Sequence, residues 1–496
     1  MEAEVARDAE AGAARAPAHA SAWPDWLPTV LYLAMAAFFV AFVPLLVHRF
    51  FDPDEFQHAH AAWSISRGLV LYKDLFEHHT PWYYALIRPL FRWFPAAASF
   101  DDARRFMIAA RALSVVLAVG AVALLTRVGR IWESRRVGLL AAALMVTQPF
   151  FIKKTVEIRP DLLALPFFLA ALGALLRGVS PRAPVRGRRA MWFALAGLSQ
   201  GSAIMCTQKM LFVLPGVAAG LGLWVLAEER LSRAAHVLLF LVAVALPGVA
   251  TWQVFRWLHA GDYFILNNFL LNARWARIPA EQLIRFVGTS APVLALAIYG
   301  AVRALPGLAR ADRRDPGEAL LLCLVVWLFV AIEFIPAAQM QYYLMPLPIV
   351  CLFAARALDD LAHRLGRRIW PWALAALSVL PLVNLGMDLS MTNGKQLARL
   401  RQVAETTRAT DLVMDGWQGL GVFRPNAFYY YFINDEILLM IPPERFSVFM
   451  DDMEAGRLRP ALIVLDRRLV ALGPRFRAFV NAHYGSRDGL LYYWAG

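Results

Sequence analysis

Long apolar stretches recur through most of this chain. A membrane-spanning helix needs about 20 mostly apolar residues, because the hydrocarbon core of a bilayer is about 30 Å thick. Eleven stretches fit this description, and we expect spans at 27–47, 106–126, 137–152, 160–176, 190–207, 210–227, 237–257, 285–302, 318–335, 342–357 and 369–387. The apolar run 190–227 is too long for one span, so we predict a tight hairpin with Lys209 at its turn. The pattern therefore predicts an α-helical polytopic membrane protein with about eleven transmembrane helices.

Composition excludes an ordinary soluble protein. Of the 496 residues, 59% are hydrophobic and 18% are charged, whereas a soluble domain is roughly 45–50% apolar and about 25% charged. Cys206, Cys323 and Cys351 lie inside apolar runs without a paired spacing, so we interpret them as small buried residues. The first apolar run has no small-residue cleavage site close behind it, which predicts an uncleaved helix rather than a signal peptide.

The distribution of basic residues explains much of the net charge of +13. Lys and Arg are denser in five loops than in the segments between them: 127–136, 177–189, 228–236, 303–317 and 356–368. The positive-inside rule places these loops in the cytoplasm, together with the N-terminal tail 1–26. Eleven spans then place the first long loop, 48–105, and the C-terminal segment on the outer face.

The segment after the last span carries a different pattern. Asp411–Asp415 and Ala461–Asp466 contain short apolar runs flanked by polar, helix-like stretches. This alternation predicts a small α/β domain. We therefore divide the chain into the cytoplasmic tail, a transmembrane domain over 27–387 and an extracytoplasmic α/β domain over 388–496.

Ionisable residues gather in the loop that follows the first span. One group contains Asp52, Asp54, Glu55, His58 and His60. Any loop that leaves a bilayer becomes polar, so this group alone does not define a site. A second group of acids and imidazoles follows in the same loop, with Asp74, Glu77, His78 and His79. Two such clusters on one interfacial loop indicate a site.

At these residues the chain resembles a known family. An Asp-Glu pair just outside the first helix, a following helix that ends in glycine, and Tyr-x-Asp and His-x-Pro before an aromatic helix are similar to the membrane glycosyltransferases of the GT-C fold. The narrower resemblance is to the branch of protein O-mannosyltransferases and aminoarabinose transferases. Glu157–Asp161, Lys209 and Gln341–Pro348 also match, and the resemblance covers about residues 27–387.

The resemblance implies an inverting hexosyl- or pentosyltransferase that moves a sugar from a polyprenyl-phosphate donor to an acceptor on the outer face. This reaction needs a carboxylate as general base and cations that hold the phosphate leaving group. By the resemblance Asp54 is the candidate base, and Glu55 positions the substrate or Asp54. Asp-Pro-Asp-Glu also offers a register in which Asp52 is the base, but we favour Asp54. The candidate substrate-binding residues are Asp52, Tyr72, Asp74, His78, His79, Glu157, Arg159, Asp161, Lys209, Tyr342 and Tyr343.

A divalent metal is the one cofactor candidate. Glu77 and His78 offer a carboxylate and an imidazole, which are good ligands for zinc or manganese. Adjacent side chains on an extended segment point to opposite faces, so we expect only one histidine to join Glu77. Hydrogen bonding to donor or acceptor is the favoured alternative. His79-Thr80-Pro81 stands where aminoarabinose-type relatives carry Lys-Pro-Pro, which argues against their donor specificity.

Several residues keep two interpretations. Lys209 is a phosphate ligand or a snorkelling lysine, and we favour the first. Lys153 and Lys154 fit headgroup anchors best. The pair Arg274-Trp275 either covers the donor site or anchors its loop at the membrane interface. Glu333 is either an intramembrane carboxylate with a function or an ordinary loop acid.

The main alternative function is a polytopic lipid or sugar transporter or flippase. Transporters place ionisable groups near the bilayer midplane and often contain repeats, whereas these groups fall at one predicted edge and no repeat is evident. A non-catalytic scaffold is the third alternative.

The expected partners are the polyprenyl-phosphate sugar donor, the lipid bilayer and an acceptor that is a protein, a lipid or a polysaccharide, with no nucleic acid. In the C-terminal segment, Trp417 and the aromatic run Tyr429–Phe432 suggest a surface that meets the acceptor. The expected location is a bacterial inner or plasma membrane.

Overall fold

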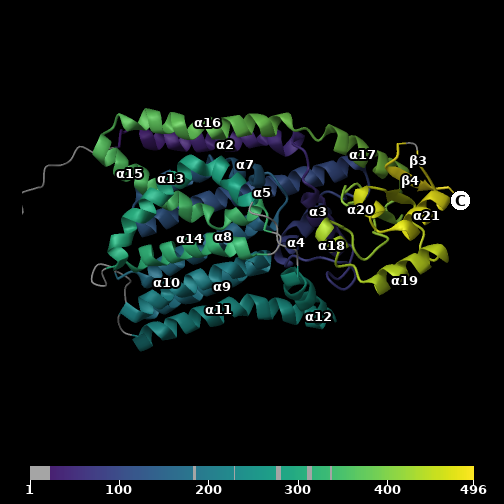
Figure 1. Cartoon of the computed structure of the whole chain (residues 1–496), viewed down its shortest axis with the longest axis horizontal. Helices are drawn as coiled ribbons and strands as arrows, with labels where there is room; N and C mark the ends of the chain where they lie inside the picture. Colours follow the sequence, from purple (N-terminus) through teal and green to yellow (C-terminus); the bar gives the residue numbers. More distant parts are fainter. Residues whose placement is uncertain are drawn as a thin grey trace, which may run out of the picture.

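A computed structural model describes residues 23–181, 186–227, 230–274, 281–309, 315–335, 338–486 and 488–495. Long helices lie side by side along most of the molecule, and a smaller region that contains the strands occupies one end (Figure 1). Of the expected N-terminal tail, residues 1–22 lie outside the described part.

Every predicted span coincides with a helix or with two successive helices. They are α2 (Leu27–His48), α5 (Phe100–Trp132), α6 (Arg135–Val146) with α7 (Pro149–Thr155), α8 (Pro160–Val179), α9 (Arg186–Cys206), η2 (Gln208–Phe212) with α10 (Val213–Ala227), α11 (Arg230–Trp257), α13 (Glu281–Ala309), α14 (Pro316–Phe334), α15 (Leu347–Leu365) and α16 (Ile369–Ser390). Within the described residues, eight helices are long and apolar enough to cross a membrane, or nine if the α6–α7 pair forms one broken span. The fold is thus helical and polytopic, and the count of eleven remains a prediction.

The third predicted span is bent rather than straight. Helices α6 and α7 meet at an angle of 71°. Pro149 is the first residue of α7 and has no backbone N–H to continue the hydrogen-bond ladder of α6. The bend places Lys153 and Lys154 in a short separate helix beside the loop that carries Glu157.

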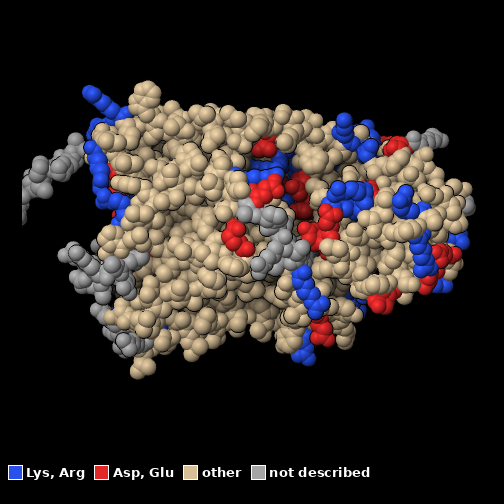
Figure 2. Space-filling model, viewed as in Figure 1, with Lys and Arg blue, Asp and Glu red and all other residues tan. Residues whose placement is uncertain are grey.

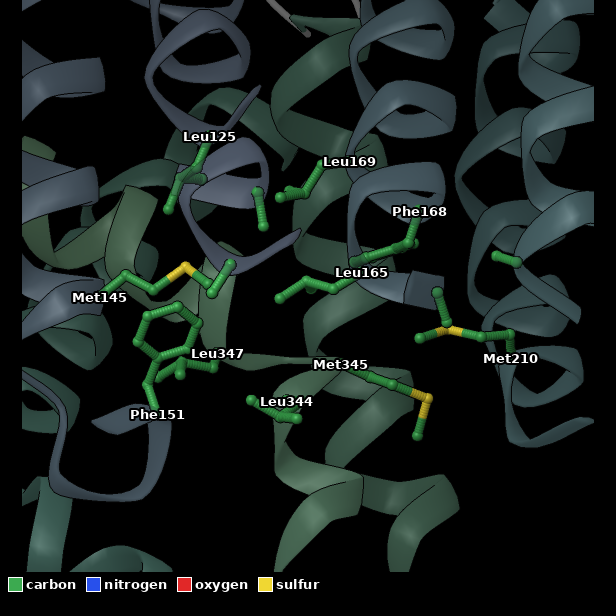
Figure 3. Close-up of a cluster of buried hydrophobic side chains, with 14 of the residues drawn as sticks. Leu125, Met145, Phe151, Leu165, Phe168, Leu169, Met210, Leu344, Met345 and Leu347 are labelled. Carbon is green, nitrogen blue, oxygen red and sulfur yellow. The ribbon is translucent and has the colours of Figure 1, made fainter. Parts of the chain in front are cut away.

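The helices share an apolar core near the level where α7 and α15 begin. Figure 3 shows this cluster, which includes the fully buried Leu125, Met145, Phe151, Leu165 and Leu347. These five side chains come from five different elements, so one cluster joins α5, α6, α7, α8 and α15. Burying a large apolar side chain stabilises a fold by about 1.5–3 kcal/mol when the alternative is exposure to water. Within a bilayer, van der Waals packing between helices stabilises such a cluster instead.

Helices α5 and α6 approach each other through glycine. A Cβ atom on Gly129 would lie 2.4 Å from Cα of Gly138, and a Cβ on Gly138 would lie 2.2 Å from the carbonyl oxygen of Thr126. Only glycine fits at such a crossing, which is the way small residues bring membrane helices together.

The C-terminal region contains the predicted strands. After α17 (Gly394–Thr406), a four-stranded sheet has the order β1-β2-β4-β3, with β1 (Val413–Asp415) parallel to β2 (Leu462–Val464) and antiparallel pairing of β3 (Tyr484–Ser486) and β4 (Leu491–Trp494). Four short helices complete it: α18 (Asp435–Leu438), α19 (Pro443–Glu454), α20 (Arg467–Val470) and α21 (Pro474–His483). The prediction of a small α/β region is therefore confirmed.

The first long loop lies between the helical bundle and the sheet region. It contains α3 (Pro53–Ser66), α4 (Trp82–Ile87) and η1 (Arg88–Arg92), and the segment after α11 contributes α12 (Gly261–Ile265), η3 (Leu266–Leu270) and η4 (Asn272–Arg274). One more short element, η6 (Met340–Leu344), precedes α15.

The sheet region docks on α3. His60 Nδ1 is 2.8 Å from the carbonyl oxygen of Val422, and its ring stacks on Tyr431 with centroids 3.5 Å apart. Gly419 adopts φ +74°, and a Cβ there would lie 2.3 Å from the ring of Phe56. Residues more than 350 positions apart in the chain thus form one contact, which fixes the sheet region above the loop.

Candidate active site

The N-terminus of α3 holds the Asp-Glu pair in a capping arrangement. Asp52 is the N-cap residue and its Oδ1 accepts a hydrogen bond from the backbone N of Asp54 at 3.1 Å. Glu55 Oε1 accepts one from the backbone N of Asp52 at 2.9 Å. This reciprocal pair satisfies backbone donors that a helix start otherwise leaves free. Asp54 lies between the two capping residues, so the caps set its position.

Glu55 is buried and fully engaged. Arg111 donates to both of its oxygens, from Nε at 2.8 Å and from Nη2 at 2.7 Å. The backbone N of Ile158 also donates to Oε2 at 3.1 Å. Arg111 in turn donates to backbone carbonyls of Leu46, Arg49 and Phe50. Glu55 therefore ties the start of α3 to α5 and to the end of α2.

Asp54 and Asp52 share one cation. Arg159 Nη2 lies 2.8 Å from Asp54 Oδ2 and 3.2 Å from Asp52 Oδ1. Both carboxylates keep more than a quarter of their side-chain surface exposed. Burial and the nearby charge of Glu157 raise the pKa of Asp52, although Arg159 opposes the shift. Asp54 is thus a carboxylate held by a guanidinium and open to the cavity described below.

Glu157 is the centre of a buried ion cluster. It accepts from Lys154 Nζ at 2.7 Å, from Arg49 Nη2 at 3.1 Å and from Nε of Arg159. Burial acts to raise the pKa of this carboxyl, but Lys154, Arg159 and Arg49 together hold it well below its usual value. Arg49 also lies 3.4 Å from Asp388 at the end of α16. Glu157 thereby orients the cation that contacts Asp54.

Lys209 lies at the predicted turn between α9 and α10. Its Nζ is 2.6 Å from Asp161 Oδ1 and 4.5 Å from the centre of the Tyr342 ring. Only 6% of Lys209 is exposed. A lysine that merely snorkels would reach water, whereas this one is held by an acid and an aromatic face within the site.

Glu77, His78 and His79 form a compact cluster. Their ligand atoms lie within 4.8 Å of one another, so the structure brings both imidazoles near the carboxylate, where we expected one. Glu77 Oε1 accepts from the backbone N of His78 at 2.8 Å and of His79 at 3.0 Å, and from His79 Nδ1 at 2.8 Å. Gln57 Nε2 contacts both carboxylate oxygens. The donor types suit zinc or manganese, but a metal at Glu77 would compete with these hydrogen bonds. The arrangement fits a hydrogen-bonded anchor better.

Three candidates lie away from the cavity. Tyr72 is buried with φ +72°, and its hydroxyl donates to the carbonyl oxygen of His79 at 2.8 Å. Asp74 is exposed and accepts from the backbone N of Val70 at 2.7 Å, which closes a turn. Tyr343 stacks on Phe286 with centroids 4.3 Å apart. These contacts shape the loop and η6.

Two further sequence candidates also fall outside the site. Glu333 is exposed near the end of α14 and does not line the cavity. Of the pair Arg274-Trp275, Arg274 does not line it either, and Trp275 lies outside the described residues.

One cavity of about 1380 Å³ joins these groups. Its lining includes seven of the predicted site residues: Asp52, Asp54, His78, His79, Arg159, Lys209 and Tyr342. Basic and acidic side chains gather in the middle of the molecule, between the helical bundle and the sheet region (Figure 2). Glu55, Glu157 and Asp161 stand behind the lining and hold its charged members.

The cavity also contains residues that the sequence interpretation missed or placed elsewhere. Lys153 and Lys154 line it, although the sequence favoured headgroup anchors. Behind the lining, Arg111, which lies inside a predicted span and donates to Glu55, is the main omission. A charge inside a predicted span is a default functional suspect and should have identified it. Gln57 and Asp388 carried no such signal.

The site residues come from five segments that the charge distribution assigned to one face. The five segments are 48–105, 153–159, 208–209, 258–285 and 336–341, and the cavity lining takes Asp52, Arg159, Lys209, Asn272 and Gln341 from them in that order. Asn272 Nδ2 donates to the carbonyl oxygen of His78 at 2.8 Å. The structure brings them together at the end of the bundle that faces the sheet region (Figure 1). Which side of a membrane this end occupies remains a prediction.

Comparisons with known proteins relate the fold to membrane glycosyltransferases. Residues 79–255 match the family model of dolichyl-phosphate-mannose-protein mannosyltransferases. The structure of ArnT from Cupriavidus metallidurans in the apo state superposes with a TM-score of 0.68 at 14% identity, covering 94% of this chain and 97% of that one. The same protein bound to undecaprenyl phosphate gives 0.66 at 13% identity, with the same coverage.

A longer enzyme shares the fold as well. The archaeal oligosaccharyltransferase AglB from Archaeoglobus fulgidus, in complex with an inhibitory peptide and a dolichol-phosphate, gives a TM-score of 0.62 at 12% identity over 95% of this chain and 75% of its own. A comparison with curated protein sequences gives no match. The chain therefore has the GT-C fold of membrane glycosyltransferases, which confirms the resemblance noted in the sequence. The superposition with ArnT covers nearly the whole of each chain.

Proposed function

We propose that this protein is an inverting glycosyltransferase that moves a sugar from a polyprenyl-phosphate donor to an acceptor. The observation that carries the proposal is one cavity whose lining includes Asp54 together with Lys153, Lys154, Arg159 and Lys209. A carboxylate beside several cations is what the reaction needs, because the base must be ionised before it accepts the proton of the acceptor and the cations stabilise the phosphate that leaves as an anion. A transporter is disfavoured, since these charges gather at one end of the helices.

Asp54 is the proposed general base. Its carboxylate removes the proton from the acceptor hydroxyl as that oxygen attacks the anomeric carbon, and the bond from that carbon to the phosphate oxygen breaks. Attack from the face opposite the leaving phosphate inverts the configuration. Glu55 acts as a positioning residue, because its contacts with Arg111 and the caps set the start of α3.

The phosphate has a set of cations available. Lys153 is exposed, lines the cavity and makes no ion pair among the residues that the structure describes. Lys209 reaches the cavity beside Tyr342. Each can make a charge-assisted hydrogen bond to phosphate without giving up the Glu157 cluster. These two lysines are the proposed phosphate ligands, with Arg159 shared between Asp54 and the phosphate.

The lipid tail has an apolar route beside these cations. Phe150, Leu211, Phe212 and Pro215 line the cavity at α7, η2 and the start of α10. Structures with this fold hold undecaprenyl phosphate in ArnT and a dolichol-phosphate in AglB. We propose the same class of carrier for this chain, with the site on the outer face of a bacterial inner or plasma membrane, the N-terminus in the cytoplasm and 388–496 outside.

The decisive experiment compares Asp54→Asn with the wild type in lipid nanodiscs. Free undecaprenyl phosphate released from a panel of undecaprenyl-phosphate monosaccharides is measured by mass spectrometry, with a membrane extract as the source of acceptor. We expect release to fall at least about 100-fold, because a general base contributes roughly 10²–10⁴ in rate. Binding of undecaprenyl phosphate should stay within about twofold.

Asp101→Asn is the matched control, since Asp101 is exposed at the start of α5 and outside the cavity. If the wild type releases undecaprenyl phosphate and the Asp54→Asn variant releases it equally fast, Asp54 is not the base. A wild-type protein that binds no undecaprenyl phosphate would overturn the proposed function itself.

A further inference from the structure

The C-terminal region supplies a distinct wall of the same cavity. The residues concerned are Trp417, Phe432, Asn434, Asp435, Glu436 and Arg468. They come from the segment after β1, from the start of α18 and from α20. None of them is used by the base or by the proposed phosphate ligands, so the function of this wall is unassigned.

Trp417 is held in a fixed orientation on this wall. Its backbone N donates to Asp466 Oδ2 at 2.8 Å, and its ring meets Phe432 edge to face with centroids 6.0 Å apart. The guanidinium of Arg468 lies 4.6 Å from the ring centre. The indole Nε1 is buried and has no hydrogen-bond partner among the described residues. Because this nitrogen is not exposed to the cavity, Trp417 offers a ligand its ring atoms rather than a hydrogen-bond donor.

The cavity is large enough for two ligands. Its volume of about 1380 Å³ exceeds the roughly 300–1,000 Å³ of a typical small-molecule site. The donor headgroup occupies the wall with the lysines and Asp54. Space against the C-terminal wall therefore remains for the acceptor.

The two walls differ in charge, and this difference selects the chemistry of the second ligand. The lysines lie on the bundle side, whereas Asp435, Glu436 and Arg468 lie on the C-terminal side. Arg468 pairs with Asp435, so Glu436 gives this wall its net negative charge. A carboxylate disfavours a second phosphate. It accepts hydrogen bonds from hydroxyl groups, and an aromatic ring beside it packs against a C–H face.

We propose that Trp417, Phe432 and Glu436 form a subsite for a neutral pyranoside ring of the acceptor, so that the acceptor is a glycan or the sugar headgroup of a glycolipid. The apolar face of the ring packs on the aromatic pair, and its hydroxyls donate to Glu436. The inference rests on the proposed function, because it assigns the second substrate of the same cavity.

The test is saturation-transfer NMR on the full chain in nanodiscs. The probes are methyl glucopyranoside, methyl mannopyranoside and methyl galactopyranoside at millimolar concentration, with Nα-acetyl-lysine amide as a cationic probe. We expect at least one pyranoside to receive saturation, and Trp417→Ala to weaken its binding about tenfold. Trp93→Ala is the matched control, since Trp93 is 70% exposed and outside the cavity. Glu436→Gln, an isosteric change, should also weaken binding.

A second arm separates the acceptor from the sugar of the donor. The bound probe should persist when the protein is loaded with undecaprenyl phosphate or with undecaprenyl-phosphate glucose. Displacement by the glucose-bearing lipid alone would assign the ring to the donor and overturn the proposal. No saturation of any pyranoside, or saturation only of the lysine probe, would also overturn it. Undecaprenyl phosphate binding measured on the same sample reports separately on the proposed function.

Discussion

The buried pair of Glu55 and Arg111 offers a quantitative test of how the Asp-Glu motif works. Both side chains are 0% exposed and meet through two hydrogen bonds. Removing one partner of a buried ion pair leaves an uncompensated charge and costs about 3–5 kcal/mol. Glu55→Gln should therefore destabilise the protein by about this amount, because Gln keeps the shape and loses the charge.

Arg111→Met should be worse than Glu55→Gln. Arg111 also satisfies the carbonyls of Leu46, Arg49 and Phe50, and each buried carbonyl left unsatisfied adds about 1–3 kcal/mol. The assay is thermal unfolding in nanodiscs, followed by intrinsic fluorescence, together with retention on size exclusion. A Glu55→Leu/Arg111→Met double variant should recover the charge penalty but keep the loss at the carbonyls.

The expected order of stability is thus wild type, Glu55→Gln, then Arg111→Met. Sugar transfer should fall in Glu55→Gln, in Arg111→Met and in the double variant, because the start of α3 that positions Asp54 loses its anchor. If Glu55→Gln unfolds at the same temperature as the wild type and only its activity falls, Glu55 contacts the substrate directly, and its assignment as a positioning residue is wrong.

Three further predictions concern the cavity and the docked sheet region. Lys209→Met should weaken binding of undecaprenyl phosphate about ten- to hundredfold, the equivalent of one charged hydrogen bond; unchanged affinity in native mass spectrometry would remove Lys209 from the site. Burial and the nearby Asp466 raise the pKa of Asp415 to about 7, so its contribution to stability is full below about pH 4 and is lost as the pH rises through 7. The melting temperature of Asp415→Asn should therefore rise relative to that of the wild type as the pH is raised from 5 to 8. A difference between the two melting temperatures that does not change with pH would contradict this. Gly419→Ala should destabilise docking on α3, because its Cβ would clash with the ring of Phe56. Gly489→Ala is the control and should cost only the left-handed backbone strain of about 1–2 kcal/mol, because a Cβ at Gly489 meets nothing within 4 Å. Equal melting temperatures of the two variants would refute the role of the contact between Gly419 and Phe56.

Sequence reasoning located the elements well because apolar length is a local property. Each predicted span met a helix, and the turn at Lys209 was confirmed between Cys206 and Val213. The bend between α6 and α7 was missed, although Pro149 marks its position. Strands β1 and β2 were also located, since short apolar runs between polar segments are typical of a buried parallel pair. Strands β3 and β4 were missed.

The candidate site was predictable only in part, because pairing across the chain has no local signal. Asp54, Arg159 and Lys209 were named from motifs and do line one cavity. Arg111 lies 56 positions from Glu55, and no periodicity connects them. Trp417 stood out in the sequence as an aromatic of the C-terminal segment, but its place beside the same cavity depends on the docking of the sheet region.

The position of α3 between the bundle and the sheet region has a consequence for biogenesis. The cavity wall runs from Asp52 to Arg468 in the sequence, so an unfinished chain that carries the helices and the base still lacks the wall that closes the cavity. The cavity therefore acquires its full lining only after the C-terminal segment has been synthesised and has docked on α3.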